Sequence, residues 1–159
     1  MCRHVLVAID ESDYSRTALP TAIDMAKKFG ADLFVLHVAE HDRGRAAVYS
    51  MESPAEATKL VADAVKTARE AGIAAKGEVF DVAAGHVAKA IIETGAANEI
   101  DLIVMGSRGL SDVQGLLLGS VTHRVIQLAH VAVLVARGPI PATQKAEQPA
   151  HAGMALATA

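Results

Sequence analysis

Five short apolar runs divide the chain, and polar or helix-forming segments separate them. Most of the runs are continuous rather than alternating and are rich in β-branched residues, which is typical of strands buried on both faces of a parallel sheet. They predict strands at residues 4–9, 32–39, 74–80, 101–105 and 131–136. The third is the weakest of the five because Lys76, Gly77 and Glu78 interrupt it.

Helices are predicted between these runs. The first follows Ser12, an expected N-cap, and should end at Gly30 after two lysines; Pro20 within it is expected to kink it. The second starts at SPAE, a capping box with Ser53 as the cap and Glu56 at the third position, and ends at Gly72. A polar stretch, residues 41–52, leads into it and is assigned no strand.

A third, short helix is predicted over residues 85–95. The fourth carries Val121, Val125 and Leu128 at the i, i+4, i+7 spacing of one helical face. The alternation of strand and helix indicates an α/β fold: a single open five-stranded parallel sheet, Rossmann-like, with helices on both faces and right-handed crossovers. Residues 1–137 form the predicted domain, and residues 138–159, rich in Ala, Pro and Gly, are expected to be a disordered tail.

Composition narrows the class of protein. A formal net charge of -3 and a pI near 6.1 argue against nucleic acid as the main partner. No apolar run approaches the roughly 20 residues of a membrane span, and HVLVAI is too short and too soon interrupted by Asp10 and Glu11 for a signal peptide. The single cysteine, Cys2, suits a reducing compartment. We therefore expect a cytoplasmic protein without nucleic-acid or membrane partners.

Glycines are concentrated in VMGSRGLSDVQGLLLGSV, after the fourth predicted strand and before the last helix. A turn explains any one of them, but four in so short a segment indicate that the backbone closely approaches a ligand. A helix N-terminus beyond the carboxyl end of a parallel strand offers N–H groups and a positive dipole end to an anion. The segment has no lysine for a Walker A loop and no Gly-x-Gly-x-x-Gly fingerprint.

What the segment does contain is the string Gly106-x2-Gly109-x9-Gly119-Ser120. With HVLVAIDES in the first predicted strand and VLHVAE in the second, this string resembles the universal stress protein family, specifically its ATP-binding branch. The resemblance covers residues 1–137. It implies an adenine nucleotide alpha hydrolase-like fold with strand order 3-2-1-4-5, and ATP with Mg²⁺ or Mn²⁺ as the ligand.

The resemblance also implies roles for single residues. Asp10 would contact the ribose or the base edge, and Ala8 and Val38 would flank or pair with the adenine. The glycines and the Ser120 hydroxyl would hold the ribose and the phosphates. The implied ATP-binding residues are Ala8, Asp10, Val38, Met105, Gly106, Arg108, Gly109, Gly119, Ser120 and Val121.

Some positions leave alternatives open. Glu11 stands where family members often have glycine, and its carboxylate either weakens nucleotide binding or helps to hold a divalent metal. Arg108, the only Lys or Arg between Met105 and Arg124, either contacts the phosphates or points to solvent. Ser120 and its neighbour one turn on, His123, fit a helix cap and a surface histidine better than a nucleophile and base.

The sequence therefore predicts an ATP-binding regulatory or stress-response module whose bound state alters binding to a protein partner. The alternatives are a slow ATPase or autokinase and a nucleotide-free dimeric interaction protein. Phosphoryl transfer needs a positioned metal, cations and an aligned nucleophile, and few of these are evident, so turnover is expected to be slow. The last strand, Val131 to Ala136, is expected to lie at the sheet edge and to pair with its copy in a homodimer.

Overall fold

The computed structural model describes residues 1–44, 47–50, 53–108 and 118–137, with the backbone alone for residues 42–44 and 47–50. Five parallel strands form its sheet, in the order β4-β2-β1-β5-β6. Their bounds are β1 His4–Ile9, β2 Asp32–Gly44, β4 Ala75–Ala83, β5 Leu102–Gly106 and β6 Ala132–Ala136. In chain order of the parallel strands this is the predicted 3-2-1-4-5 arrangement, which confirms the fold class.

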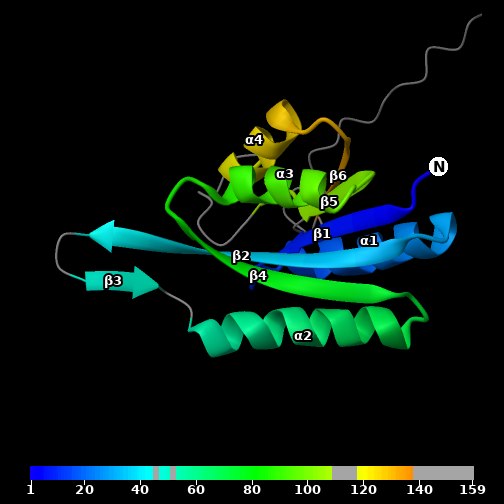
Figure 1. Cartoon of the computed structure of the whole chain (residues 1–159), viewed down its shortest axis with the longest axis horizontal. Coiled ribbons are helices and arrows are strands. Elements are labelled where there is room, and N and C mark those ends of the chain that lie inside the picture. Colours follow the sequence, from blue (N-terminus) through cyan, green and yellow to red (C-terminus); the bar gives the residue numbers. More distant parts are fainter. Residues whose placement is uncertain (45–46, 51–52, 109–117, 138–159) are drawn as a thin grey trace, which may run out of the picture.

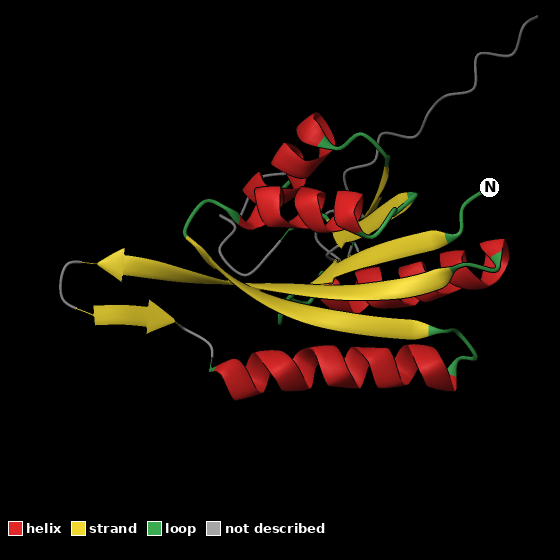
Figure 2. Cartoon of the chain, viewed as in Figure 1, coloured by secondary structure: helices red, strands yellow, loops and turns green. Residues whose placement is uncertain are grey.

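Four helices cover the two faces of the sheet in the described part of the chain. They are α1 Ser15–Phe29, α2 Pro54–Glu70, α3 Val87–Ala97 and α4 Ser120–Leu128. Figure 1 shows α2 and α1 on one side of the strands and α3 and α4 on the other, and Figure 2 shows the same layers by secondary structure. None of the described helices is both long enough and apolar enough to cross a membrane.

Side chains of β1 and β2 are buried alternately on both faces, as their continuous apolar sequences require. Val5, Val7 and Val35 belong to the core beneath α1 and α2. Leu6 and Leu36 belong to the core beneath α3 and α4, and all five side chains are fully buried. The central strands therefore form a rigid platform between two apolar cores.

Gly77 in β4 sets how closely α2 packs on the sheet. A Cβ at this position would lie 2.4 Å from Val61 Cγ1, 2.9 Å from Val65 Cγ2 and 3.0 Å from the Val35 carbonyl oxygen. The glycine that weakens the strand signal in the sequence is thus required by the packing of α2. The predicted capping box at Ser53 is confirmed at the start of this helix, with Glu56 N–H donating to Ser53 Oγ at 3.2 Å.

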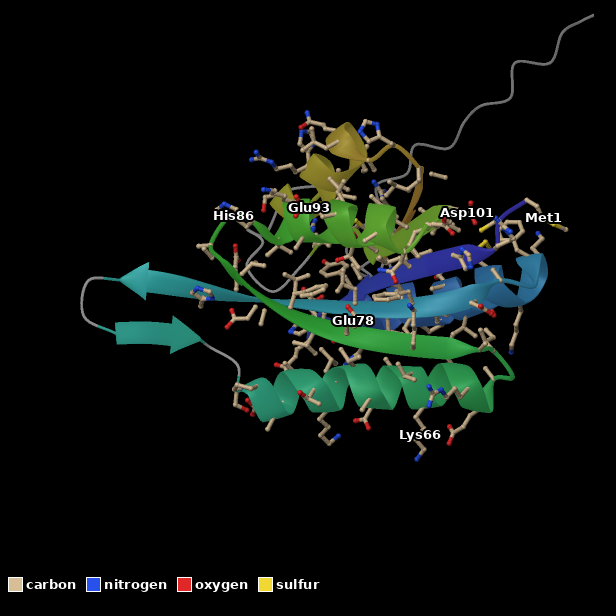
Figure 3. All side chains as sticks on the ribbon, in the orientation of Figure 1. Met1, Lys66, Glu78, His86, Glu93 and Asp101 are labelled. Atoms are coloured by element: carbon tan, nitrogen blue, oxygen red, sulfur yellow. The ribbon has the colours of Figure 1, made fainter. Side chains whose placement is uncertain are left out.

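Asp101 fixes the amino end of the sheet. Its Oδ2 accepts hydrogen bonds from the backbone N–H groups of Arg3 (2.7 Å) and His4 (3.0 Å), and these bonds lower the pKa of Asp101 below its usual value. Figure 3 shows Asp101 near Met1 at this end of the sheet and His86 at the other end, where α3 begins. The amino end is thus tied by structural contacts, and the carboxyl end carries the predicted site.

The polar stretch before α2 differs from its prediction. β2 continues to Gly44, and residues 47–50 form a sixth strand, β3, antiparallel to it. Past His37, its last residue paired with β1, strand β2 continues beyond the end of β1. It pairs there with β4 as far as His41 and with β3 from His41 to Gly44 (Figure 1). Backbone pairing between β2 and β3 thus overrides the polar composition of this stretch, which alone indicated a connection.

Two helices differ in detail from the sequence pattern. α1 begins at Ser15 with Tyr14 as its N-cap, rather than directly after Ser12, and Gly30 ends it in the left-handed conformation as expected. In α4, Val125 is buried, but Leu128 on the same predicted face is 49% exposed. The last turn of α4 therefore reaches past the edge of the core.

Replacing Gly77 tests the packing of α2. Gly77→Ala should lower the free energy of unfolding by about 1–3 kcal/mol, because the new methyl group overlaps Val61 and Val65. The matched control is Gly95→Ala in α3, where the nearest atom to the added Cβ is 3.7 Å away. That change should leave stability unchanged or raise it by up to about 1 kcal/mol. Urea unfolding measures both, and equal stability of the two variants would contradict the assignment.

Candidate functional site

The loops that follow β1 and β5 meet because these two strands are neighbours. Their register pairs Ala8 with Met105, so the chain leaves β1 at Asp10 and leaves β5 at Ser107 on adjacent positions of the same sheet edge. The strand order reverses here, between β2-β1 and β5-β6. Ligands of open α/β sheets bind at such a point.

Asp10 organises the turn between β1 and α1. Its Oδ1 accepts hydrogen bonds from Ser12 N–H (3.0 Å), Ser12 Oγ (2.5 Å) and Ser15 Oγ (2.6 Å). Ser15 Oγ also lies 2.7 Å from Asp10 N, and both serine residues are buried. Asp10 thus has a structural role that the sequence prediction omitted, and its contact with a ligand stays a prediction.

Gly106 is explained first by packing. A Cβ there would lie 2.8 Å from Tyr14 Cβ and 3.0 Å from the Tyr14 carbonyl carbon. The absence of a side chain lets the β1–α1 turn lie directly against the end of β5. The glycine therefore brings the two loops together, whatever else it contacts.

Arg108 bridges the same two loops. Its Nη1 donates to Tyr14 Oη at 3.2 Å, and its guanidinium carbon lies 5.6 Å from the centroid of the Tyr14 ring. The side chain is half-buried rather than extended into solvent. Arg108 thus lies on Tyr14, and its contact with the phosphates stays a prediction.

The start of α4 is fixed to the end of β5. Gly119 N–H donates to the Ser107 carbonyl at 2.8 Å, and Ser107 N–H donates to the Ala136 carbonyl at 2.9 Å. Thr122, which is buried, donates its hydroxyl to the Gly106 carbonyl at 2.9 Å. The first turn of α4, including the exposed Ser120, is therefore held beyond the carboxyl ends of β5 and β6.

An apolar floor lies next to this helix turn. Met105 is buried in the α3–α4 core, and the half-buried Ala8, Val38 and Val121 pack against that same core. All four are residues for which the sequence predicts nucleotide contact. Three come from adjacent strands and one from α4, so the topology brings them to one face of the sheet.

One edge of β2 is interrupted beside this floor. β1 pairs with β2 as far as Ile9 opposite His37, and β3 pairs on that same edge from Ser50 opposite His41. Between these pairs, residues 38–40 pair with β4 on their other edge, but with no described strand on this one. We refer to this interval, residues 38–40 on the β1 side of β2, as the β2 gap. Backbone groups at such a gap are positioned to hydrogen-bond a planar ring edge.

Comparison with known proteins agrees with this arrangement. The model of the universal stress protein family matches residues 1–137. The chain belongs to the universal stress protein family.

Similar proteins span nearly the whole chain. The universal stress protein YxiE of Bacillus subtilis is 35% identical over 156 residues, covering 86% of this chain and 100% of YxiE. Universal stress protein UspA from Lactobacillus plantarum has a similar fold, with a TM-score of 0.70 and 24% identity over 85% of this chain and 97% of UspA. A universal stress protein solved in complex with cAMP has a TM-score of 0.63 and 28% identity, over 87% of this chain and 98% of that protein.

The universal stress protein fold brings most of the predicted site residues together at the carboxyl end of the sheet. Gly109 is the exception, because it lies outside the described residues. Sequence reasoning missed three residues that hold the site together, Tyr14, Ser107 and Thr122. The serine and the threonine lie beside the glycines of the motif, but nothing in the sequence marks Tyr14, since its role depends on contacts between segments distant along the chain.

Neither a group of metal ligands nor a surface groove adds to the site in the described residues. In the described residues, no three His, Cys, Asp or Glu side chains are grouped as metal ligands. A groove of about 850 Å³ lies between α2 and β4, lined by Val61, Val65, Arg69 and Val79 among others. It runs along the outer edge of β4, with β2 between it and β1. The groove therefore does not belong to the region where the β1 and β5 loops meet.

The structural role of Asp10 has a measurable consequence. Asp10→Ala should lower the free energy of unfolding by about 2 kcal/mol without any ligand, because it leaves the buried Ser12 and Ser15 groups without their charged acceptor. Asp13→Ala is the matched control, since the Asp13 side chain is 87% exposed and its pairing with Arg16 at 3.6 Å should be worth about 0.5 kcal/mol or less. Thermal and urea unfolding test both, and a neutral Asp10→Ala would argue that the turn is held by other contacts.

Proposed function

We propose that this universal stress protein binds an adenine nucleotide, ATP, where the β1 and β5 loops meet, and acts as a nucleotide-dependent regulatory module in the stress response. The observation that carries the proposal is the convergence at one point of Asp10, the β5 loop and the first turn of α4. Each belongs to a different part of the chain, and together they offer a carboxylate, glycine backbone and a helix N-terminus.

The phosphates are assigned to the N-terminus of α4. The first amides of a helix have no intrahelical acceptor, and the helix dipole favours an anion there. Gly119 is the N-cap of α4 and has an extended backbone conformation. Because its own N–H closes the loop onto Ser107, we assign the phosphate contacts to the amides that follow it, with the Ser120 hydroxyl beside them.

The base is assigned to the β2 gap. Adenine presents a donor and an acceptor side by side, and the backbone of an extended strand presents the complementary pair. Val38 lies at the start of the gap, and the half-buried Ala8 and Val38 provide apolar contact with a ring. The relative solved with cAMP, an adenine nucleotide, supports the choice of base.

A regulatory role is favoured over rapid catalysis. Glu11 is exposed beside the site and would be a carboxylate ligand for a divalent ion bound mainly by the phosphates, which is how Mg²⁺ is commonly bound with nucleotides. When bound, that ion would neutralise phosphate charge. The exposed Ser120 and His123 at the start of α4 fit a helix terminus better than a nucleophile with its base.

Calorimetry with purified protein tests the binding proposal. ATP should bind, and GTP should bind at least tenfold more weakly, about 1.4 kcal/mol. The reason is that guanine has a hydrogen-bond acceptor, its 6-oxo group, where adenine has the amino donor that a backbone carbonyl of the β2 gap would accept.

A substitution at the start of α4 tests the phosphate site. Gly119→Val should weaken ATP binding by a similar factor, since a branched side chain would occupy space at the phosphate site. Ala96→Val, on the exposed side of α3, is the control. Absence of ATP binding to the native chain would refute the proposal.

We also propose that the protein is a homodimer built on β6. This strand pairs with β5 on one side and with no described strand on the other. Val133, Leu134 and Val135 are half-buried, and Ile126 and Leu128 of α4 are 45% and 49% exposed. An apolar edge strand of this kind favours pairing with a second copy.

Charges on the β6 edge should separate the protomers. Val133→Lys with Val135→Lys would place two lysines in the proposed seam, where burial without partners is costly. Sedimentation velocity at micromolar concentration should give a dimer for the native chain and a monomer for this variant. Phe80→Lys, on the opposite edge strand β4, should remain dimeric. A native chain that sediments as a monomer would exclude the interface.

A further inference from the structure

Tyr14 occupies a position that links both loops of the site. It is the N-cap residue of α1, and its backbone and Cβ lie against Gly106 so closely that no side chain fits between them. The Gly106 carbonyl oxygen in turn accepts a hydrogen bond from the buried hydroxyl of Thr122 in α4. The Tyr14 ring is therefore anchored at the point where β1, β5 and α4 meet.

The ring and hydroxyl of Tyr14 hold Arg108 without neutralising it. The guanidinium contacts the aromatic ring at 5.6 Å from its centroid and donates one hydrogen bond to the phenol oxygen. Both partners are uncharged, and in the described part of the chain no carboxylate forms an ion pair with Arg108. A guanidinium has five N–H donors, and the contact with Tyr14 uses one of them.

The turn that Arg108 contacts through Tyr14 has an acidic sequence. The β1–α1 turn carries Asp10, Glu11 and Asp13, and the nearby Arg16 pairs with Asp13 at the surface. Arg108 is the only lysine or arginine between Lys89 and Arg124. It is thus the one lysine or arginine in the loop after β5, and it contacts an acidic turn. A polyphosphate near that turn needs a positive charge more than a monophosphate does.

We propose that Tyr14 positions Arg108 so that its guanidinium recognises the outer phosphates of the nucleotide, and that this pair sets the preference for ATP over AMP. The proposal rests on the proposed function and adds the residues that distinguish nucleotides by phosphate number. Arginine suits this role because its planar fork matches phosphate oxygens. Tyr14 is a positioning residue: it reduces the freedom of the arginine side chain and need not contact the ligand.

The experiment compares affinities for ATP, ADP and AMP by calorimetry on the full chain. Arg108→Gln should weaken ATP binding about tenfold and leave AMP binding within about twofold, so the ATP/AMP affinity ratio falls. Tyr14→Phe keeps the ring and the Gly106 contact but removes the phenol oxygen, and should lower the same ratio by about threefold. Arg16→Gln removes an equal charge from an exposed side chain and should leave the ratio unchanged.

The double variant Tyr14→Phe with Arg108→Gln separates positioning from general structural damage. If Tyr14 acts through Arg108, the double variant should match Arg108→Gln alone, because the two changes remove one interaction. Additive losses, or equal losses for all three nucleotides, would overturn the proposal. If the native chain binds ATP and AMP but the ratio does not respond to Arg108→Gln, this proposal fails while the proposed function stands. If the native chain binds no adenine nucleotide, both fail.

Discussion

The parallel pairing of β1 with β5 is the constraint on which the rest of the site depends. It places two loops side by side that are far apart in the sequence, and the pairing of Ala8 with Met105 fixes how they meet. Apolar side chains buried on both faces of β1 hold this pairing in place. Gly106 then lets Tyr14 approach, and Thr122 fixes α4 at the same point, so the site follows from the register of two central strands.

The fold follows from the sequence where periodicity alone decides the structure. Continuous apolar runs located four of the five parallel strands, and a weaker, interrupted run located β4. Capping residues such as Ser53 and Gly30 located helix ends. β3 was not predictable, because it is only four residues long, lies within a stretch with many polar residues, and forms through pairing with β2. Leu128 lies on the predicted inner face of α4, but the core ends before it. Such features depend on the finished arrangement and have no local signal.

The candidate site was predictable as a set of positions, and less so as a set of roles. The glycine string indicated where the backbone is bare, but Gly106 is also required by its contact with Tyr14. Asp10 was predicted as a ligand contact, and its Oδ1 also holds a buried turn. In both cases one residue serves structure at a place where binding is proposed, and a sequence pattern does not separate the two. Their packing contributions are read only from three-dimensional contacts.

The strands on either side of the β2 gap fix its size. From His37, the last residue opposite β1, to His41, the first opposite β3, the chain advances four residues, or about 13 Å at the usual rise of a strand. Both ends are closed by hydrogen-bonded backbone, so the opening does not widen without unpairing a strand. The β2–β3 hairpin and the end of β1 therefore set the length of β2 backbone that the proposed adenine would have to pair with, and a β1 strand three residues longer would pair with the same residues.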